Sequence, residues 1–151
     1  MKSGIPGVEI RAIRRFEDAR GWLMETFRSD EMSEDAFPAM GYVSCTKPGV
    51  ARGPHEHVDQ TDGFAFLFGR YTLYLWENRP GYPPLAEIFE VGEANPVFVA
   101  VPPGVVHAYR NAGEDEALVL NFPNRLYAGP KRAEPVDEIR HEDDPESPFR
   151  L

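Results

Sequence analysis

Short hydrophobic stretches recur along the whole chain, and in some of them, such as residues 8–13, hydrophobic and polar residues alternate. Successive side chains of a β-strand point to opposite faces, so this alternation predicts strands with one buried face. The expected strands cover residues 8–13, 22–27, 41–46, 64–68, 71–76, 87–91, 97–101, 107–110 and 117–122. Strands that recur at intervals of roughly ten residues are typical of an antiparallel sandwich or barrel.

The segments between these strands carry turn signals. Residues 16–21 predict a turn, and the polar residues 29–37 predict one short helix. Gly69 and Arg70 stand between two hydrophobic runs and predict a tight hairpin. Residues 132–151 are charged and rich in proline, so we expect an irregular tail that packs on the barrel.

Length and charge narrow the class of protein. A chain of 151 residues suits one domain with a sizeable core, so we expect a single domain over residues 1–151. The net charge of −9 argues against a nucleic-acid partner. The single cysteine, Cys45, excludes an intrachain disulfide, fits a reducing cytoplasm and is expected to be buried. Neither a signal peptide nor an apolar run of about 18 residues is present, so we expect a cytoplasmic protein without a membrane partner.

Three histidines and an aspartate stand at spacings that suggest one site. His55 and His57 lie in a strand-like segment, where residues i and i+2 share a face. Asp62 follows, and His107 comes behind a Pro-Gly turn. Three imidazoles and a carboxylate suit a divalent ion such as Zn, Fe, Ni or Mn. The alternative is that His107 is a hydrogen-bonded barrel histidine and Asp62 a turn residue.

The same residues resemble the two metal-site motifs of the cupin superfamily. The first motif, H-x-H-x4-D-x6-G, runs from His55 to Gly69 and has Asp62 where that superfamily usually has Glu. The second, P-x-G-x2-H-x3-N, runs from Pro102 to Asn111. The resemblance implies an all-β, antiparallel jelly-roll β-barrel of the cupin type with few short helices. It leaves the metal open, because many cupins have lost theirs.

The chain is also similar, as a divergent member, to the dTDP-4-dehydrorhamnose 3,5-epimerase-like family of the cupin superfamily. Matching motifs follow the family's order over nearly the whole chain: FEDARGWLME at 16–25, RGPH at 52–55, Gly69, ENR at 77–79, PPGVVH at 102–107 and Asp144-Pro145. The resemblance implies a homodimer that acts on a nucleotide-linked, dTDP-type 4-keto-6-deoxy sugar and requires no cofactor.

The resemblance also implies roles for individual residues. His55 is the expected base that removes the proton next to the sugar ketone, because imidazole titrates near neutral pH. Asp144 is its expected carboxylate partner, with Asp143 as the alternative. A guanidinium group can grip phosphate oxygens with two hydrogen bonds. The expected substrate-binding residues are Arg20, Glu25, Arg52 and Arg79.

Several positions depart from the epimerase pattern: Met40 and Tyr42 replace an expected glutamine and asparagine, and three further changes bear on the chemistry. His57 stands where the family has glutamine, and Asp62 stands where a substrate-binding lysine is expected. Both changes supply metal-ligand groups beside His55. Asn121 stands where the catalytic tyrosine is expected, and Tyr109 and Tyr127 are the candidates to replace it. A single epimerisation or an isomerisation therefore fits better than full 3,5-epimerisation.

Three functions remain open from the sequence. The first is a sugar-nucleotide epimerase or isomerase that works by proton abstraction at His55. The second is a metal-dependent cupin enzyme that binds its ion through His55, His57, Asp62 and His107. The third is a non-catalytic cupin that binds a sugar nucleotide. The fourth histidine, His141, lies in the acidic tail and is expected to be exposed.

Overall fold

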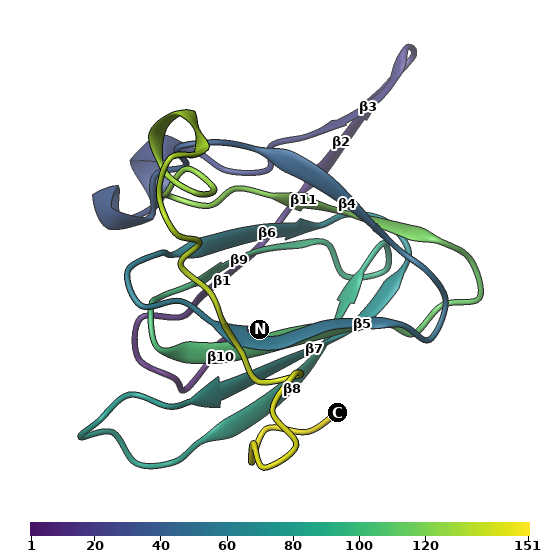
Figure 1. Cartoon of the computed structure of the whole chain (residues 1–151). Helices are drawn as coiled ribbons and strands as arrows, with labels where there is room; N and C mark the ends of the chain where they lie inside the picture. The colour runs from purple at the N-terminus through teal and green to yellow at the C-terminus, as the bar shows by residue number, and fades with distance from the viewer.

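Two five-stranded antiparallel sheets face each other and form a barrel (Figure 1). The computed structural model describes every residue, 1–151. The strand order is β1-β9-β6-β11-β4 in the first sheet and β12-β5-β10-β7-β8 in the second. A separate hairpin of β2 and β3 projects away from the barrel (Figure 1).

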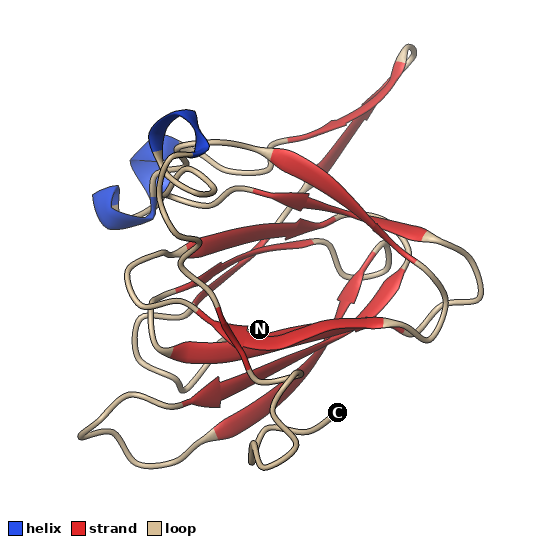
Figure 2. Cartoon of the chain, viewed as in Figure 1, coloured by secondary structure: helices blue, strands red, loops and turns tan.

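Strands make up nearly all of the regular structure, as Figure 2 shows. The strands are β1 (Glu9–Ala12), β2 (Arg15–Asp18), β3 (Gly21–Met24), β4 (Tyr42–Thr46), β5 (Ala51–Glu56), β6 (Asp62–Phe66), β7 (Arg70–Glu77), β8 (Ala86–Gly92), β9 (Val97–Val101), β10 (Val105–Asn111), β11 (Ala117–Asn121) and β12 (Ile139–Arg140). The helical segments are three single 3₁₀ turns, η1 (Ser29–Glu31), η2 (Glu34–Ala36) and η3 (Pro130–Arg132). No helix in the structure has the length and apolarity needed to cross a membrane.

The predicted antiparallel, all-β fold is confirmed, and β9 has the predicted bounds. Two local predictions are wrong. Residues 29–37 form two 3₁₀ turns, η1 and η2, in place of one helix. Residues 16–18, expected in a turn, belong to β2 and pair with β3.

The predicted hairpin at Gly69 and Arg70 is also wrong. β6 lies between β9 and β11 in the first sheet, whereas β7 lies between β10 and β8 in the second. All five residues of β6 are buried, while β7 alternates between buried and partly exposed positions. A strand that is buried on both faces is covered on each side by other parts of the protein, as β6 is in the middle of the first sheet. The chain therefore does not turn back to pair β7 with β6 but crosses to the second sheet at Gly69.

The main hydrophobic core fills the space between the two sheets. Its fully buried members include Phe66, Tyr71, Leu73, Val99 and Val119. A smaller cluster covers the outer face of the first sheet beneath the η2 turn; it comprises Ile13, Ala36, Ala65, Leu67, Phe98 and Ala100. Phe64 and Phe66 point into the main core whereas Ala65 points outward, as the twofold repeat of a strand requires.

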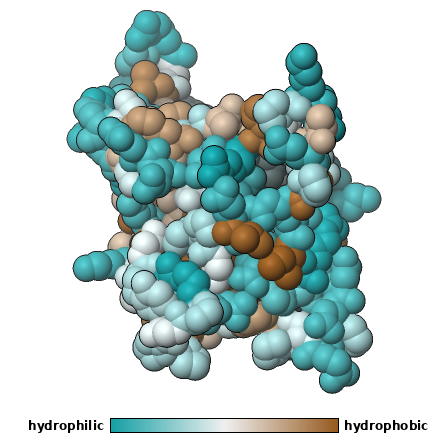
Figure 3. Space-filling view, turned by 60° about the vertical axis from the view of Figure 1, so that its left-hand side comes forward, coloured by the Kyte–Doolittle hydropathy of each residue, from teal (hydrophilic) through white to brown (hydrophobic).

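The edge strand β4 shows why the expected burial of Cys45 is wrong. Ser44 and Thr46 are buried, and Val43 and Cys45 point to solvent. An edge strand with one wet face keeps this alternation whatever the polarity of the individual side chain. The surface in Figure 3 is mostly hydrophilic, with hydrophobic residues in small groups, in keeping with the acidic composition.

The C-terminal tail runs along β5 (Figure 1), and β12 pairs with that strand. The Asp137 carboxylate accepts the backbone N–H groups of Val58 and Asp59, at 2.8 Å each. His141 is mostly buried, which corrects the expected exposure. Its Nε2 atom lies 2.9 Å from Oε1 of the buried Glu56, and this contact holds the tail against β5.

Candidate functional site

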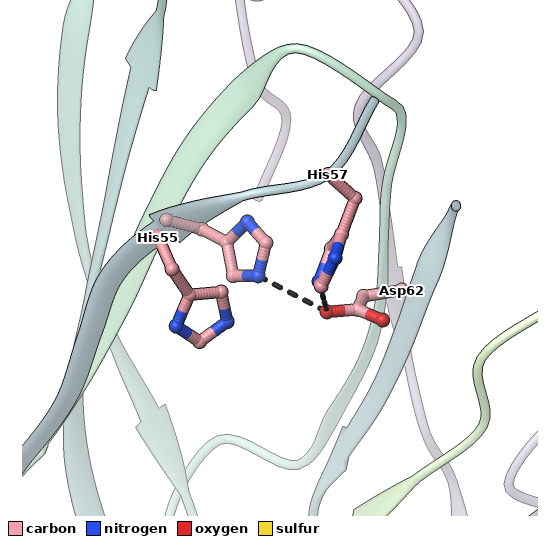
Figure 4. Close-up of side chains that lie close together, drawn as sticks. His55, His57 and Asp62 are labelled. Carbon is pink, nitrogen blue, oxygen red and sulfur yellow. Dashed lines mark hydrogen bonds and ion pairs between the residues drawn. The ribbon is translucent and has the colours of Figure 1, made fainter. Parts of the chain in front are cut away.

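The barrel brings together the four residues that the sequence predicts as a cluster. His55 lies on β5, His57 directly follows β5, Asp62 begins β6, and His107 lies on β10. One ligand atom from each residue lies within 4.8 Å of those of the other three (Figure 4). The pairing of β10 with β5 places His107 opposite His55. The predicted convergence is confirmed, and Asp62 is a buried strand residue rather than a turn residue.

The Asp62 carboxylate is the centre of the cluster. Its Oδ2 atom lies 2.9 Å from Nε2 of His57 and 3.1 Å from Nε2 of His107. Its Oδ1 atom accepts a 2.7 Å hydrogen bond from Gln60. Gln60 was not predicted as a site residue, although its spacing of two residues from Asp62 is a signal that could have found it.

Backbone carbonyl groups orient both imidazole rings. Nδ1 of His57 donates to the carbonyl oxygen of Asp137, and Nδ1 of His107 donates to that of Val105 at 3.0 Å. The two Nε2 atoms therefore point at the same carboxylate oxygen. Here each Nε2 is hydrogen-bonded to Asp62, and a ring whose Nδ1–H is held in this way offers Nε2 as its ligand atom once that nitrogen has lost its proton.

Charges in the cluster are coupled. Burial alone lowers the pKa of His57, but the hydrogen bond and attraction of Asp62 outweigh it and raise the pKa to about 9. Burial raises the pKa of Asp62, and the hydrogen bonds from His107 and His57 outweigh it, so this pKa lies well below its ordinary value. At neutral pH an imidazolium at His57 thus faces an ionised Asp62, and each satisfies the other's buried charge.

His55 has a different environment from the other two histidines. Burial, and then repulsion from His107, lower the pKa of His55 to about 2, so its ring is neutral at pH 7. Its ring centroid lies 4.5 Å from that of His107. Its Nδ1 atom lies 4.0 Å from Oε1 of Glu138, a residue of the tail. Burial thus makes this ring a weaker base than the near-neutral imidazole expected from the sequence, and the Glu138 carboxylate lies where it would stabilise an imidazolium at His55.

The structure does not bring the expected partner, Asp144, to His55. Asp144 is exposed, and its Oδ1 atom accepts a 2.9 Å hydrogen bond from the backbone N–H of Glu146. Asp143 is exposed as well. The tail stays on β5 as far as Glu142, whose backbone N–H donates to the carbonyl oxygen of Pro54, and the carboxylate that reaches His55 belongs to Glu138.

A β-bulge at Gly53 allows both Arg52 and His55 to face the cavity. Residues three apart on a regular strand point to opposite faces. Here His107 pairs with His55 while Tyr109 pairs with Arg52, so β5 contains one extra residue. Gly53 has φ +82°, and a Cβ atom there would lie 2.5 Å from the carbonyl oxygen of His107. Only glycine fits this position.

A cavity of about 550 Å³ opens beside the cluster, between β5, the facing strands and the tail. Three guanidinium groups line it. Arg52 is held by Oγ1 of Thr46 at 3.0 Å, and Arg125 and Arg140 pair with carboxylates at 2.7 Å. Of the arginines predicted to bind substrate, Arg52 alone lies in this wall. Arg125, Arg140 and Glu138 were missed, because the segments that carry them have no strand-like pattern.

The other predicted substrate-binding residues lie outside the cavity. Arg20 is at the tip of the β2–β3 hairpin, where its side chain is 87% exposed and pairs with Asp18. Glu25 follows β3 and lies 3.5 Å from a guanidinium nitrogen of Arg28. Arg79 follows β7, and its guanidinium lies 2.6 Å from the Glu77 carboxylate.

Two facing antiparallel sheets, with histidines from inner strands around one cavity, define a jelly-roll barrel of the cupin type. The family model described as "Polysaccharide biosynthesis C-terminal domain" matches residues 16–134, and the chain belongs to this family. The chain is similar to a Haloferax volcanii protein named "Probable low-salt glycan biosynthesis epimerase Agl13". The two are 36% identical over 126 residues, which cover 82% of this chain and 81% of that protein.

Solved structures share the fold. NovW, described as a 4-keto-6-deoxy sugar epimerase from the novobiocin gene cluster of Streptomyces spheroides, superposes with a TM-score of 0.79 at 22% identity. The match covers 97% of this chain and 77% of NovW. A dTDP-4-dehydrorhamnose 3,5-epimerase from Sulfolobus tokodaii gives 0.74 at 20% identity, covering 92% and 79%. These matches confirm the predicted cupin-type jelly roll.

Proposed function

We propose that the protein is an epimerase or isomerase of a nucleotide-linked 4-keto-6-deoxy sugar, with dTDP as the expected nucleotide. The observation that carries the proposal is the position of His55 in the cavity wall, beside the Glu138 carboxylate and guanidinium groups. The names of the Haloferax relative and of NovW support the reaction class. We assign the reaction to polysaccharide synthesis in the cytoplasm, where nucleotide sugars are available.

The chemistry follows from the acidity of a C–H bond next to a ketone. Loss of that proton gives a carbanion that delocalises into an enolate, so a positioned base can remove it. Nδ1 of His55 faces Glu138, which leaves Nε2 to take the proton. The Glu138 carboxylate then stabilises the imidazolium, the role that the sequence led us to expect of Asp144.

The three guanidinium groups of the cavity wall, those of Arg52, Arg125 and Arg140, would hold the diphosphate. All three residues are solvent-exposed, and their present partners are a hydroxyl, a backbone carbonyl and carboxylates. Phosphate oxygens can replace such partners at Arg52 and Arg125 and can join Glu138 at Arg140, and bidentate guanidinium–phosphate pairing would orient the sugar. The sugar would then lie over His55.

The test is hydrogen exchange at the sugar. Purified protein is incubated with dTDP-4-keto-6-deoxyglucose in D2O, and NMR follows deuterium at the carbons next to the ketone together with new epimers. We expect exchange in the wild type and a loss of about 100-fold or more in His55→Gln. The matched control, His141→Gln, removes an imidazole outside the cavity, and the glutamine amide can still donate to Glu56 and hold the tail, so this variant should keep the activity. No exchange over a panel of 4-keto nucleotide sugars would leave only a binding role.

A second candidate is metal-dependent catalysis in the same cavity, favoured by the orientation of the His57 and His107 rings. Their Nδ1–H groups are bound to backbone carbonyls, and their Nε2 atoms converge with Asp62 and His55. This donor set fits a divalent ion such as Zn, Fe, Ni or Mn. Such an ion, when bound, would polarise the sugar carbonyl.

Metal analysis separates the two candidates. Protein purified without added metal should contain near-stoichiometric metal under the second candidate, and His57→Ala should lose both metal and activity. Retained exchange activity after chelation and dialysis, with metal below about one tenth of the protein on a molar basis, would refute it. The first candidate predicts this retention.

We also propose that the protein is a homodimer. The β2–β3 hairpin pairs only with itself and exposes Phe16, Trp22 and Leu23. A two-stranded hairpin is marginally stable alone, so a second copy that covers these side chains would stabilise it. Arg20, at the hairpin tip, would then act on substrate in the cavity of the second copy, because it lies outside its own.

A mixing experiment tests this arrangement. Arg20→Ala and His55→Gln are each expected to be inactive as pure proteins, and light scattering should give twice the chain mass. Co-refolding the two variants should restore about a quarter of the wild-type activity, because a mixed dimer keeps one complete site. A monomeric mass, or no recovery in a verified mixed dimer, would contradict the proposal.

A further inference from the structure

The Glu138 carboxylate needs support on both sides of the chain to stay beside His55. Glu138 directly precedes β12, a strand of only two residues that pairs with Glu56 and His55 on β5. Hydrogen bonds at the end of a short element open most easily, so the residue before that strand moves unless another contact holds it. β12 anchors the C-terminal side of Glu138, and the N-terminal side requires a second anchor.

The segment that precedes Asp137 provides no such anchor. Residues 130–136 are all exposed. The backbone hydrogen bonds donated by residues 129–134 end on carbonyl oxygens of residues 126–130, so this segment folds on itself. No backbone hydrogen bond joins residues 130–136 to the barrel. Asp137 is therefore the first residue of the tail that binds the barrel.

Asp137 binds three consecutive residues of the turn that follows β5. Its Oδ1 and Oδ2 atoms accept the backbone N–H groups of Val58 and Asp59, at 2.8 Å each. Its carbonyl oxygen accepts the Nδ1–H group of His57. Successive backbone N–H groups that face one anion form a favourable site for negative charge, and a charged acceptor makes stronger hydrogen bonds than a neutral one. Side chain and main chain of one residue thus attach the tail to this turn.

Other parts of the fold hold this turn in place. The carbonyl oxygen of His57 accepts the backbone N–H of Gly104 at 2.9 Å. The backbone N–H of Thr61 donates to Oδ1 of Asn124 at 2.8 Å. The support to which Asp137 is attached is therefore fixed to the barrel independently of the tail.

We propose that Asp137 is a positioning residue of the site, which fixes the tail on the N-terminal side of Glu138 and so holds the Glu138 carboxylate beside His55. The role rests on the proposed function, in which that carboxylate stabilises the imidazolium. Both carboxylate oxygens of Asp137 are already bound to backbone N–H groups, so this residue acts through its neighbour in the chain.

A double-mutant cycle tests the proposal. Asp137→Ala is made in the wild type and in Glu138→Gln, and each protein is assayed for deuterium exchange with dTDP-4-keto-6-deoxyglucose in D2O. In the wild type, Asp137→Ala should lower kcat about 10-fold with little change in KM. In Glu138→Gln it should change kcat by less than about twofold, because the carboxylate that it positions is gone. The control is Glu146→Ala, which removes an exposed carboxylate of the tail and should keep the rate.

Amide hydrogen exchange follows the tail without reference to activity. Asp137→Ala should speed exchange at the amides of Val58 and Asp59, which lose their acceptor, and at residues 139–140 of β12. Glu146→Ala should leave these amides protected. Asp137→Asn keeps one acceptor oxygen and should show an intermediate loss of kcat, and it keeps the test valid if Asp137→Ala does not fold.

Each other outcome overturns the inference. A kcat of Asp137→Ala within about threefold of wild type, or unchanged amide protection in β12, would exclude the role while the proposed function stands. Equal losses in the wild type and in Glu138→Gln would show that Asp137 does not act through Glu138. A raised KM with unchanged kcat would assign Asp137 to substrate binding. A wild type without deuterium exchange would remove the proposed function and this role together.

Discussion

Nδ1 of His55 lies 4.0 Å from Oε1 of Glu138, across the pairing of β5 with the short tail strand β12. The tail therefore supplies a side chain to the site as well as a cover for the barrel. Glu138 also pairs with Arg140 at 2.7 Å, so its carboxylate has a defined position next to the imidazole. Glu138 acts on the reaction through His55 and is a positioning residue.

Replacement of Glu138 should slow proton abstraction without weakening substrate binding. We expect Glu138→Gln to lower kcat about 10- to 100-fold with little change in KM, because the imidazolium at His55 loses its carboxylate. Glu138→Asp should restore part of the rate. The control is Asp144→Asn, which removes an exposed carboxylate that only accepts a backbone N–H. Steady-state kinetics measure both variants. A lower kcat for Asp144→Asn than for Glu138→Gln would contradict this role and favour Asp144, the partner of His55 expected from the sequence.

The His57–Asp62 pair predicts a specific dependence of stability on pH. The pKa of His57 is raised from 6.5 to about 9, so its stabilisation is fully present below pH 6.5 and is lost as pH rises through about 9. In metal-free protein, the free energy of unfolding should fall by an amount of the order of 3 kcal/mol over this interval, relative to His57→Gln. Urea unfolding at a series of pH values measures it, and parallel curves for the two proteins would contradict it.

The lowered pKa of Asp62 affects stability in the acid range, where the free energy of unfolding falls as the pH falls. Its stabilisation is present above the ordinary value of 3.8 and is lost as pH falls through the folded pKa. Asp62→Asn should therefore be destabilised at neutral pH, by about 3 kcal/mol, because it leaves the buried charge of His57 unpaired. Denaturant unfolding of the two proteins at pH 7 measures the difference. An equal stability at pH 7 would mean that water or another group compensates that charge.

The bulge at Gly53 should be intolerant of any side chain. Gly53→Ala forces a left-handed alanine and a clash with the carbonyl oxygen of His107, so we expect a loss of about 3 kcal/mol and a displaced His55. Gly49→Ala is the matched control, because Gly49 has φ +74° and a Cβ atom there would meet no heavy atom within 4 Å. Its cost should be about 1 kcal/mol. Thermal unfolding and exchange activity distinguish the two, and equal effects would remove the steric argument.

Metal binding should stabilise the folded cluster if the second candidate holds. An ion that binds only the folded state adds about 2.7 kcal/mol at one hundred times its Kd, so excess Zn²⁺ should raise the melting temperature of chelator-treated protein. Asp62→Asn should lose this shift. His141→Gln should keep it, because His141 pairs with Glu56 outside the cluster. If none of Zn²⁺, Ni²⁺, Mn²⁺ and Fe²⁺ raises the melting temperature, the cluster is an ion pair that binds no metal.

The sequence predicted the cluster because its signals are local or fixed by strand geometry. The i, i+2 spacing of His55 and His57 determines a common face, and the motif around His107 places it on a neighbouring strand. The position of β9 follows from a continuous hydrophobic run, Val97–Val101, which is buried throughout. Tertiary contacts elsewhere in the fold have little influence on these features.

The missed features depend on contacts that no local pattern encodes. Glu138 reaches His55 through the pairing of a two-residue strand, and the tail around it has no periodicity from which to predict that pairing. The signal at Gly69 and Arg70 describes a turn, but burial of β6 on both faces decided which strands became neighbours. The outward position of Cys45 depends on which face of an edge strand is wet.

Main-chain oxygens hold both His57 and His107, and these atoms are present whatever side chain occupies Asp137 or Val105. Substitution of Val105 would thus leave the orientation of the His107 ring unchanged, whereas Asp137 also accepts the backbone N–H groups of Val58 and Asp59 through its side chain. Ring orientations set by main-chain oxygens can be kept while the surrounding sequence diverges. In distant family members they are best recognised from the backbone conformation.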